Sequence, residues 1–264
     1  MSRFLLGLAV AACSALAAPA AGPPGWRLVW HDDFDGPVLD ATKWVRETGG
    51  DGWGNGELEF YTDRVENAHI DGDYLVIEAR RESLATRGYT SARLKTQGVG
   101  AWRYGRVEAR IQIPRGQGLW PAFWMLGDNI PSAGWPACGE IDIMENIGKE
   151  PGTVHGSLHG PSTTSPTSDA TSTFTLPAGQ NLADAFHLYA VEWEPGVVRF
   201  YVDTNLYATF TQSRWPAGGS WVFDHPFFIL LNVAVGGNWP GSPDSTTVFP
   251  QQMLVDYVRV YTKQ

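Results

Sequence analysis

The chain contains 264 residues with a formal net charge of −9, and its composition is rich in Gly (30), Pro (18) and Trp (12). The acidic balance argues against a nucleic-acid partner, whose phosphates require a basic surface, and it also opposes an anionic polysaccharide. A neutral polymer fits better, because the C–H faces of sugar rings pack against Trp.

The first segment is predicted to be an export signal. Arg3 precedes an apolar run at residues 4–10, and Ala18-Pro19-Ala20 matches the small-x-small pattern of a signal-peptidase site. We therefore expect a signal peptide over residues 1–20, a secreted protein and a single domain over residues 21–264. Neither the leader nor any later run reaches the ~20 apolar residues of a spanning helix, so we expect no transmembrane segment.

Cys13 leaves a second interpretation of the leader open. It follows Val10-Ala11-Ala12, which resembles the lipobox of bacterial lipoproteins. Cleavage there would remove residues 1–12 and leave a lipid anchor on Cys13. In either case Cys13, removed or lipidated, leaves no partner for Cys138, so we expect no disulfide.

The remainder of the chain is predicted to form short β-strands separated by turns, with no helical periodicity and no internal repeat. The expected strands are residues 74–80, 106–113, 197–202, 206–210, 227–235 and 254–261. Asp203-Thr204-Asn205 is the turn of a hairpin, and the nearly continuous apolar run at 227–235 predicts a strand covered on both faces. Many short antiparallel strands indicate an all-β sandwich of two sheets or a jelly roll.

Two segments are interpreted as loops. The glycine-rich stretch at 49–56 lacks the strand-to-helix context of a phosphate-binding turn. Residues 161–173 are rich in Ser, Thr and Pro, and strand-like sequence continues on both sides. This second stretch is therefore better explained as an excursion within one domain than as a linker between two.

Three carboxylates at 140–145 are the strongest chemical signal. Glu140 and Asp142 share one face of a predicted strand, whereas strict alternation would turn Glu145 into the core, where an unpaired carboxylate is costly. One extra residue at Ile143-Met144, a β-bulge, returns Glu145 to the face of the other two.

The bulge sets the expected spacing. It places the backbones of Glu140 and Glu145 about four strand steps, or ~13 Å, apart. Side chains that lean together then reach the ~5–5.5 Å separation of a nucleophile and an acid/base in retaining glycosidases. Asp142 can hydrogen-bond a neighbouring Glu, and its charge helps to hold a proton on Glu145. The alternative is a ladder of acids on a solvated face that binds a cation.

The segment from 140 to 145 resembles the catalytic strand of glycoside hydrolase family 16, whose bulged motif is Glu-x-Asp-x-x-Glu. With the preceding Trp135-Pro136 and Gly139 it is similar to the laminarinase branch, the endo-1,3-β-glucanases. Further agreement lies at residues 118–126, 155–159, 232–241 and 255–261. Cys138 stands where the family more often has a small residue such as Ser.

This resemblance implies roles for the three acids. Glu140 is expected to be the nucleophile, Asp142 its assistant and Glu145 the general acid/base. The implied fold is a concanavalin A-like β-jelly roll with an open cleft across its concave sheet. The implied protein is a monomeric, secreted endo-β-1,3-glucanase that needs no cofactor for catalysis and acts on a neutral β-glucan polysaccharide. The alternatives are a mixed-linkage β-1,3-1,4-glucanase, a transglycosylase, or a non-catalytic β-glucan-binding protein.

Seven further side chains are candidates for substrate binding: Trp135, Trp124, Trp120, Trp239, His159, Asn55 and Arg93. Each Trp could instead pack in the core, and Arg93 could instead be a salt-bridged surface residue. The four-residue spacing of His155 and His159 could bind zinc on a helix, but Gly156 and Gly160 favour a strand. The resemblance places His159 in the cleft beside the acid/base.

A structural calcium ion is also implied by the resemblance. Its ligands would be Asp256 and the backbone carbonyls of Asp33 and Gly72, since Ca²⁺ prefers oxygen. Such an ion would stabilise the fold without taking part in the chemistry. The alternative is that Asp256 is an ordinary surface acid on the last strand.

Overall fold

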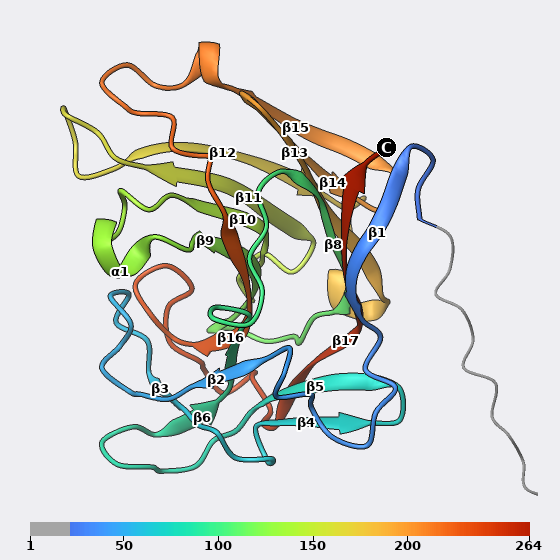
Figure 1. Ribbon diagram of the computed structural model, residues 1–264. Helices are drawn as coiled ribbons and strands as arrows, with labels where there is room; N and C mark the ends of the chain where they lie inside the picture. Colours follow the sequence, from blue (N-terminus) through green and yellow to red (C-terminus); the bar gives the residue numbers. More distant parts are fainter. Residues whose placement is uncertain (1–21) are drawn as a thin grey trace, which may run out of the picture.

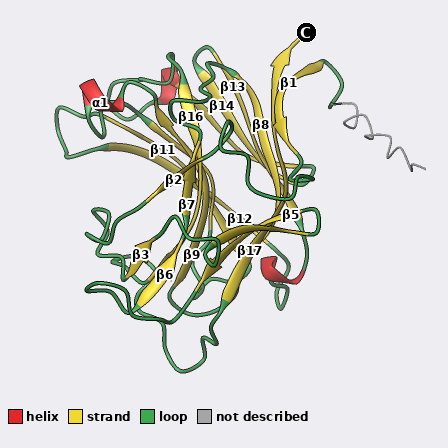
Figure 2. Ribbon diagram, turned by 60° about the horizontal axis from the view of Figure 1, so that its bottom comes forward, coloured by secondary structure: helices red, strands yellow, loops and turns green. Residues whose placement is uncertain are grey.

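The computed structural model describes residues 22–264. The signal peptide expected over residues 1–20 and the alternative lipid anchor at Cys13 lie outside the described residues. Two large antiparallel sheets make up the described chain, and its short helices lie at the periphery (Figures 1 and 2). The expected all-β jelly-roll sandwich is confirmed.

The first sheet is built around the C-terminal strand. Its strands run in the order β15 (Asn205–Thr211), β14 (Val197–Val202), β13 (His187–Glu194), β8 (Gly105–Gln112), β17 (Gln251–Lys263), β5 (Tyr74–Ala79) and β4 (Ala68–Asp71), and β1 (Trp26–Asp32) also pairs with β17. The hairpin expected around residues 203–205 is confirmed by the pairing of β14 with β15.

The second sheet carries the acidic strand in its interior, third from one edge. Its order is β12 (Ser168–Thr175), β11 (Thr153–Gly160), β10 (Glu140–Glu145), β9 (Leu119–Gly127), β16 (Phe227–Val235), β7 (Arg93–Lys95) and β2 (Val45–Glu47). The interpretation of residues 161–173 as a loop is wrong in its second half. Strand β12 begins at Ser168 and pairs along the whole of β11, because its alternating Thr side chains suit an edge strand.

The remaining elements are small. A parallel pair is formed by β3 (Glu59–Tyr61) and β6 (Tyr89–Ser91), and the helical turns are α1 (Ile130–Ala133), η1 (Leu182–Asp184) and η2 (Gln212–Arg214). Among the described residues no helix is long and apolar enough to cross a membrane.

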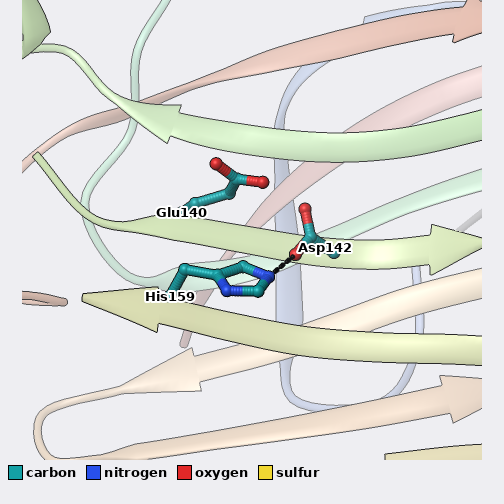
Figure 3. A group of neighbouring side chains, drawn as sticks. All are labelled: Glu140, Asp142 and His159. Atoms are coloured by element: carbon teal, nitrogen blue, oxygen red, sulfur yellow. Dashed lines mark ion pairs between the residues drawn. The ribbon is translucent and has the colours of Figure 1, made fainter. Parts of the chain in front are cut away.

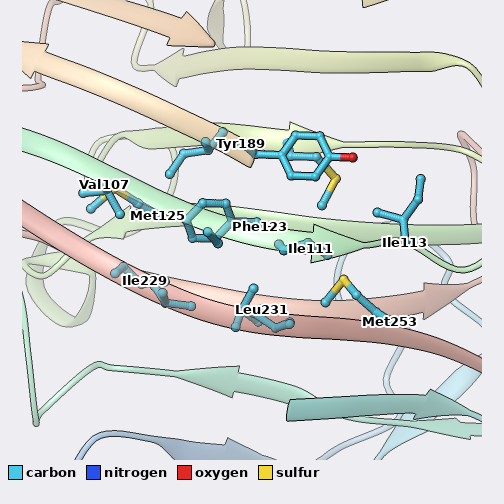
Figure 4. Packing of buried hydrophobic residues seen from close by; sticks show 14 of the residues in the cluster. Val107, Ile111, Ile113, Phe123, Met125, Tyr189, Ile229, Leu231 and Met253 are labelled. Carbon is cyan, nitrogen blue, oxygen red and sulfur yellow. The ribbon is translucent and has the colours of Figure 1, made fainter. Parts of the chain in front are cut away.

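The hydrophobic core lies between the two large sheets. Figure 4 shows Val107 and Ile111 of β8 against Phe123 of β9 and Ile229 and Leu231 of β16, and all five side chains are buried. Every residue of β16 is buried, as expected for a strand covered on both faces. Because side chains alternate along a strand, the residues between these core positions on β9 and β16 face the opposite side of the second sheet.

Candidate active site

A bulge in β10 brings the three carboxylates onto one face. The register against β9 pairs Asp142 with Trp124 and then Met144 with Phe123, so one residue is extra between them. The register against β11 shifts at the same place. Ile143 and Met144 are both buried in the core, and Glu145 emerges with Asp142 on the other face. The bulge predicted from the sequence is confirmed.

The face that carries the acids is hollowed into a cavity of about 490 Å³. Its lining includes the alternate residues of three neighbouring strands: Trp120, Ala122, Trp124 and Leu126 on β9, Glu140, Asp142 and Glu145 on β10, and Asn232 and Ala234 on β16. We call this cavity the cleft. It combines apolar surface with a few convergent polar groups, which is typical of a ligand-binding site.

Glu140 is held by an indole. Trp135 Nε1 donates a 2.7 Å hydrogen bond to Glu140 Oε2, and the Trp135 side chain is otherwise exposed at the cleft. Burial, and then the negative charge of Asp142, raise the pKa of Glu140 to about 8. The Trp135 N–H acts in the opposite direction, because it favours the carboxylate form that a nucleophile needs.

Glu145 has a matching indole on the other side of the cleft. Trp120 Nε1 donates a 2.9 Å hydrogen bond to Glu145 Oε1. Burial, followed by the charges of Asp142 and Glu140, raises the pKa of Glu145 well above its ordinary range. Such a carboxyl keeps its proton at a pH where an exposed Glu is ionised, which is the property of a general acid.

Asp142 lies between the two glutamates and contacts a histidine from the next strand. The Asp142 side chain is buried, and burial above all raises its pKa to about 7. His159 Nε2 of β11 lies 3.0 Å from Asp142 Oδ2 (Figure 3). The resemblance placed His159 in the cleft beside the acid/base Glu145, whereas the structure places it directly against Asp142 and not among the residues that line the cleft.

Sequence reasoning missed the acid behind His159. Asp169 of β12 is paired across the sheet with His159, and His159 Nδ1 lies 2.7 Å from Asp169 Oδ1. Because an ionised carboxylate can only accept a hydrogen bond, Nδ1 carries the proton. The one available signal was the presence of an acid in the Ser/Thr-rich stretch, and nothing in that stretch indicated its strand partner.

The four candidate Trp residues have different surroundings. Trp120, Trp124 and Trp135 line the cleft, as expected for substrate-binding residues. Trp239 is not among the residues that line the cleft; it packs edge-on against Trp120, with ring centroids 5.3 Å apart. Trp239 therefore buttresses the indole that holds Glu145.

Arg93 and Asn55 both line the cleft, and each also donates a hydrogen bond to a neighbouring glutamate. The Arg93 guanidinium lies over the Trp53 ring at 4.6 Å and over the Trp124 ring at 4.7 Å, and its Nε donates to Glu47 at 2.6 Å. The structure therefore shows the salt bridge and places Arg93 in the wall of the cleft, and its contact with a sugar stays a prediction. Asn55 Nδ2 donates to Glu57 Oε1 at 2.9 Å.

A buried polar chain stands behind the same wall and was not predicted. Trp124 Nε1 donates to Asn232 Oδ1 at 2.7 Å, Asn232 Nδ2 donates to the Tyr61 hydroxyl at 3.1 Å, and that hydroxyl donates to Glu57 Oε2 at 3.1 Å. The signal for Asn232 was a lone amide in an otherwise apolar strand, since a buried polar group needs partners.

The three segments of the predicted calcium site lie close together along one edge of β17 in the first sheet. β17 is irregular between Val255 and Tyr257, β1 ends beside it, and the turn at Gly72 connects β4 to β5. Asp256 Oδ2 forms a 2.7 Å ion pair with Arg110, and the Asp33 carboxylate binds Arg259 at the same distance. The Asp33 carbonyl would be the ligand, so its side-chain pairing is compatible with the prediction.

Comparisons with known proteins agree with this geometry. Residues 55–259 match the model of glycosyl hydrolases family 16. A β-glucanase from Rhodothermus marinus is 44% identical over 98% of this chain and 93% of its own length.

Two solved structures are similar over 90% of the chain, each with a TM-score of 0.85. One is the catalytic domain of an endo-1,3-β-glucanase (laminarinase) from Thermotoga petrophila, 47% identical and covered over 98% of its length. The other is the endo-β-1,3-glucanase from Pyrococcus furiosus, 49% identical and covered over 95%. The bulged acidic strand, the fold and the family match together show that this chain belongs to glycosyl hydrolase family 16.

Proposed function

We propose that this protein is an endo-β-1,3-glucanase that hydrolyses internal β-glucosidic bonds of neutral β-glucans with retention of configuration. The observation that carries the proposal is the β10 bulge, which places Glu140 and Glu145 on the same face of the cleft. The endo-1,3-β-glucanases among its relatives support the choice of substrate. Enzymes of this family need no cofactor for catalysis.

The first half-reaction cleaves the glycosidic bond. Glu145 gives its proton to the departing glycosidic oxygen while the Glu140 carboxylate attacks the anomeric carbon, and a glycosyl-enzyme ester forms. The charges of Asp142 and Glu140 support this division, because both raise the pKa of Glu145 and so favour its protonated form. The Trp135 N–H supports the anionic form of Glu140, which becomes the major form as the pH rises through its pKa of about 8.

The second half-reaction releases the sugar. Glu145, now ionised, takes a proton from water, and the resulting hydroxide attacks the anomeric carbon and regenerates Glu140. Each step inverts the anomeric centre, so the product retains the β configuration. Asp142, between the two glutamates, would position Glu140 and keep negative charge close to Glu145.

Two carboxylate replacements test the roles. Glu140→Gln and Glu145→Gln are each expected to lower the release of reducing ends from laminarin by orders of magnitude while binding is largely kept. Glu66→Gln is the matched control, because Glu66 is exposed and does not line the cleft. Near-normal turnover in either cleft variant would contradict the assignment.

The stereochemistry and the substrate class are tested separately. Proton NMR of the first products should show the β anomer before mutarotation, whereas an α product would indicate an inverting mechanism. Laminarin is expected to be hydrolysed faster than lichenan, agarose or carrageenan. Long-chain products formed early from laminarin would indicate endo action, and products longer than the substrate would indicate transglycosylation.

We also propose that residues 21–264 form a single catalytic domain that is secreted as a monomer. The leader pattern of residues 1–20 supports export, with lipid attachment at Cys13 as the alternative. Among the described residues, the exposed large apolar side chains are mostly valines from separate segments, which favours a monomer. Mass spectrometry of the exported protein and light scattering test these two points.

A structural Ca²⁺ ion bound by Asp256 and the carbonyls of Asp33 and Gly72 completes the proposal. The convergence of these three segments supports it, and so does the carboxylate at Asp256, since Ca²⁺ requires oxygen ligands. The ion would hold β1 and the β4–β5 turn against β17, in the sheet across the core from the cleft, and would leave the chemistry unchanged.

A further inference from the structure

Three ligand atoms converge at one end of the acidic strand. Glu140, Asp142 and His159 each offer one atom, and these atoms lie within 4.8 Å of one another (Figure 3). The set comprises two carboxylate oxygens and one imidazole nitrogen. Zn²⁺ accepts this mixture readily, with three protein ligands and a fourth position left to solvent.

The Asp142 carboxylate has an unused oxygen at this point. The Asp142 side chain is only 2% exposed, and its Oδ2 has no hydrogen-bond partner among the described residues. Oδ2 lies 3.0 Å from His159 Nε2, but the two atoms are not aligned as donor and acceptor. A buried carboxylate oxygen without a donor is costly, and a bound cation would remove that cost.

Asp169 prepares the histidine for such an ion. Its Oδ1 accepts from His159 Nδ1 at 2.7 Å, and its Oδ2 accepts from Thr167 Oγ1 at 2.7 Å. With the proton on Nδ1, a neutral His159 directs the lone pair of Nε2 toward Asp142. A carboxylate behind the outer nitrogen of a histidine is the usual way in which proteins orient a zinc ligand.

The spacing suits Zn²⁺ after a small adjustment. Bonds of ~2.0–2.2 Å in a tetrahedral site put neighbouring ligand atoms about 3.3–3.6 Å apart. The Asp142 and His159 atoms are already 3.0 Å apart, and a rotation of the half-buried Glu140 side chain brings in the third ligand. Mg²⁺ and Ca²⁺ fit poorly, because both prefer six or more oxygen ligands.

We propose that Glu140, Asp142 and His159 form a reversible Zn²⁺ site at the wall of the cleft, with Asp169 as the residue that orients His159. On the proposed function, Zn²⁺ bound there occupies the nucleophile and inhibits hydrolysis. The metal site itself does not depend on that function, so binding and inhibition are measured separately.

Calorimetric titration of ZnCl₂ into the metal-free protein, with no substrate and with excess Ca²⁺ present, tests the site. We expect one Zn²⁺ per chain, which excess Mg²⁺ and Ca²⁺ do not displace. His159→Gln should abolish this binding, and Asp169→Asn should weaken it about 10–100-fold, the usual effect of losing an orienting partner. His69→Gln on β4, in the other large sheet, is the matched control and should bind Zn²⁺ like the unmodified protein.

Three results would overturn the site: no stoichiometric Zn²⁺ binding, unchanged affinity in His159→Gln, or equal affinity in Asp169→Asn. Far-ultraviolet circular dichroism establishes that each variant is folded, and Asp169→Asn decides the question if His159→Gln is not. The inhibition assay then uses laminarin and the intact protein. Zn²⁺ that binds at the site without slowing hydrolysis would leave the metal site intact and count against Glu140 as the nucleophile.

Discussion

The raised pKa of Glu140 predicts that this cleft carboxylate destabilises the fold, and that Glu140→Gln relieves the cost in a pH-dependent way. The folded-state pKa is about 8, against an ordinary value of 4.5. At 1.36 kcal/mol for each pKa unit, this difference corresponds to a loss of folding stability of at most about 5 kcal/mol when Glu140 ionises. Solvent contact and the shared field of Asp142 reduce it, and we expect roughly 2–3 kcal/mol.

The sign follows from which state binds more protons. Below pH 4.5 both the folded and the unfolded chain hold the Glu140 proton, so the side chain has no pH-dependent effect. Between pH 4.5 and about 8 the unfolded chain releases the proton and the folded chain keeps it, so stability falls as the pH rises. The amide introduced by Glu140→Gln cannot ionise, so the advantage of this variant over the unmodified protein should grow across this window and then level off.

Urea unfolding followed by Trp fluorescence at pH 5 and pH 8 measures this difference. The free energy of unfolding of Glu140→Gln should exceed that of the unmodified protein by more at pH 8 than at pH 5, with equal m-values. Glu66→Gln, at an exposed site, should give the same small difference at both pH values. A constant advantage of Glu140→Gln, or one that shrinks as the pH rises, would refute the reasoning.

Three further predictions follow from other contacts. Glu59 is fully buried, and its burial, followed by the charge of Glu57, raises its pKa well above the ordinary range. Glu59→Gln should therefore raise the Tm measured by calorimetry at pH 8. A lower Tm would mean that the fold needs the carboxylate. Trp120→Phe removes the N–H that lowers the pKa of Glu145, so the basic limb of the kcat/KM profile should move to higher pH, and a shift to lower pH would contradict the contact. EDTA should lower the Tm of the unmodified protein by several degrees, which corresponds to a loss of about 1–2 kcal/mol in the free energy of unfolding, and Asp256→Asn should lack this response. An equal effect of EDTA on both proteins would show that Asp256 is not a calcium ligand.

The acidic strand could be predicted because its constraint is local. Glu145 at the wrong parity would be buried without a partner, and a single extra residue is the simplest way to avoid that cost. The β9 residues Trp120 and Trp124 followed from the same alternation. Each of these inferences needs only the neighbouring residues in the chain, and the registers of β10 and β9 bear out the bulge.

The missed features depend on pairings between distant segments. The resemblance placed His159 beside Glu145, and the order of strands alone does not specify which side chains touch. The β11–β12 register that brings Asp169 against His159 depends on a loop with no local signal. Trp239 was expected in the cleft, but its loop folds back onto Trp120. Such contacts are decided by packing rather than by periodicity.

The placement of Arg93 has a consequence for the direction from which a sugar can approach. An indole has two broad faces, and the guanidinium of Arg93 already occupies one face of Trp124 while it also lies over the Trp53 ring. A glucose ring that stacks on Trp124 is therefore restricted to the remaining face. This restriction sets the tilt of that sugar unit relative to Glu140 and Glu145. A polysaccharide whose linkage bends it differently would present its next glycosidic bond to the two carboxylates at the wrong angle.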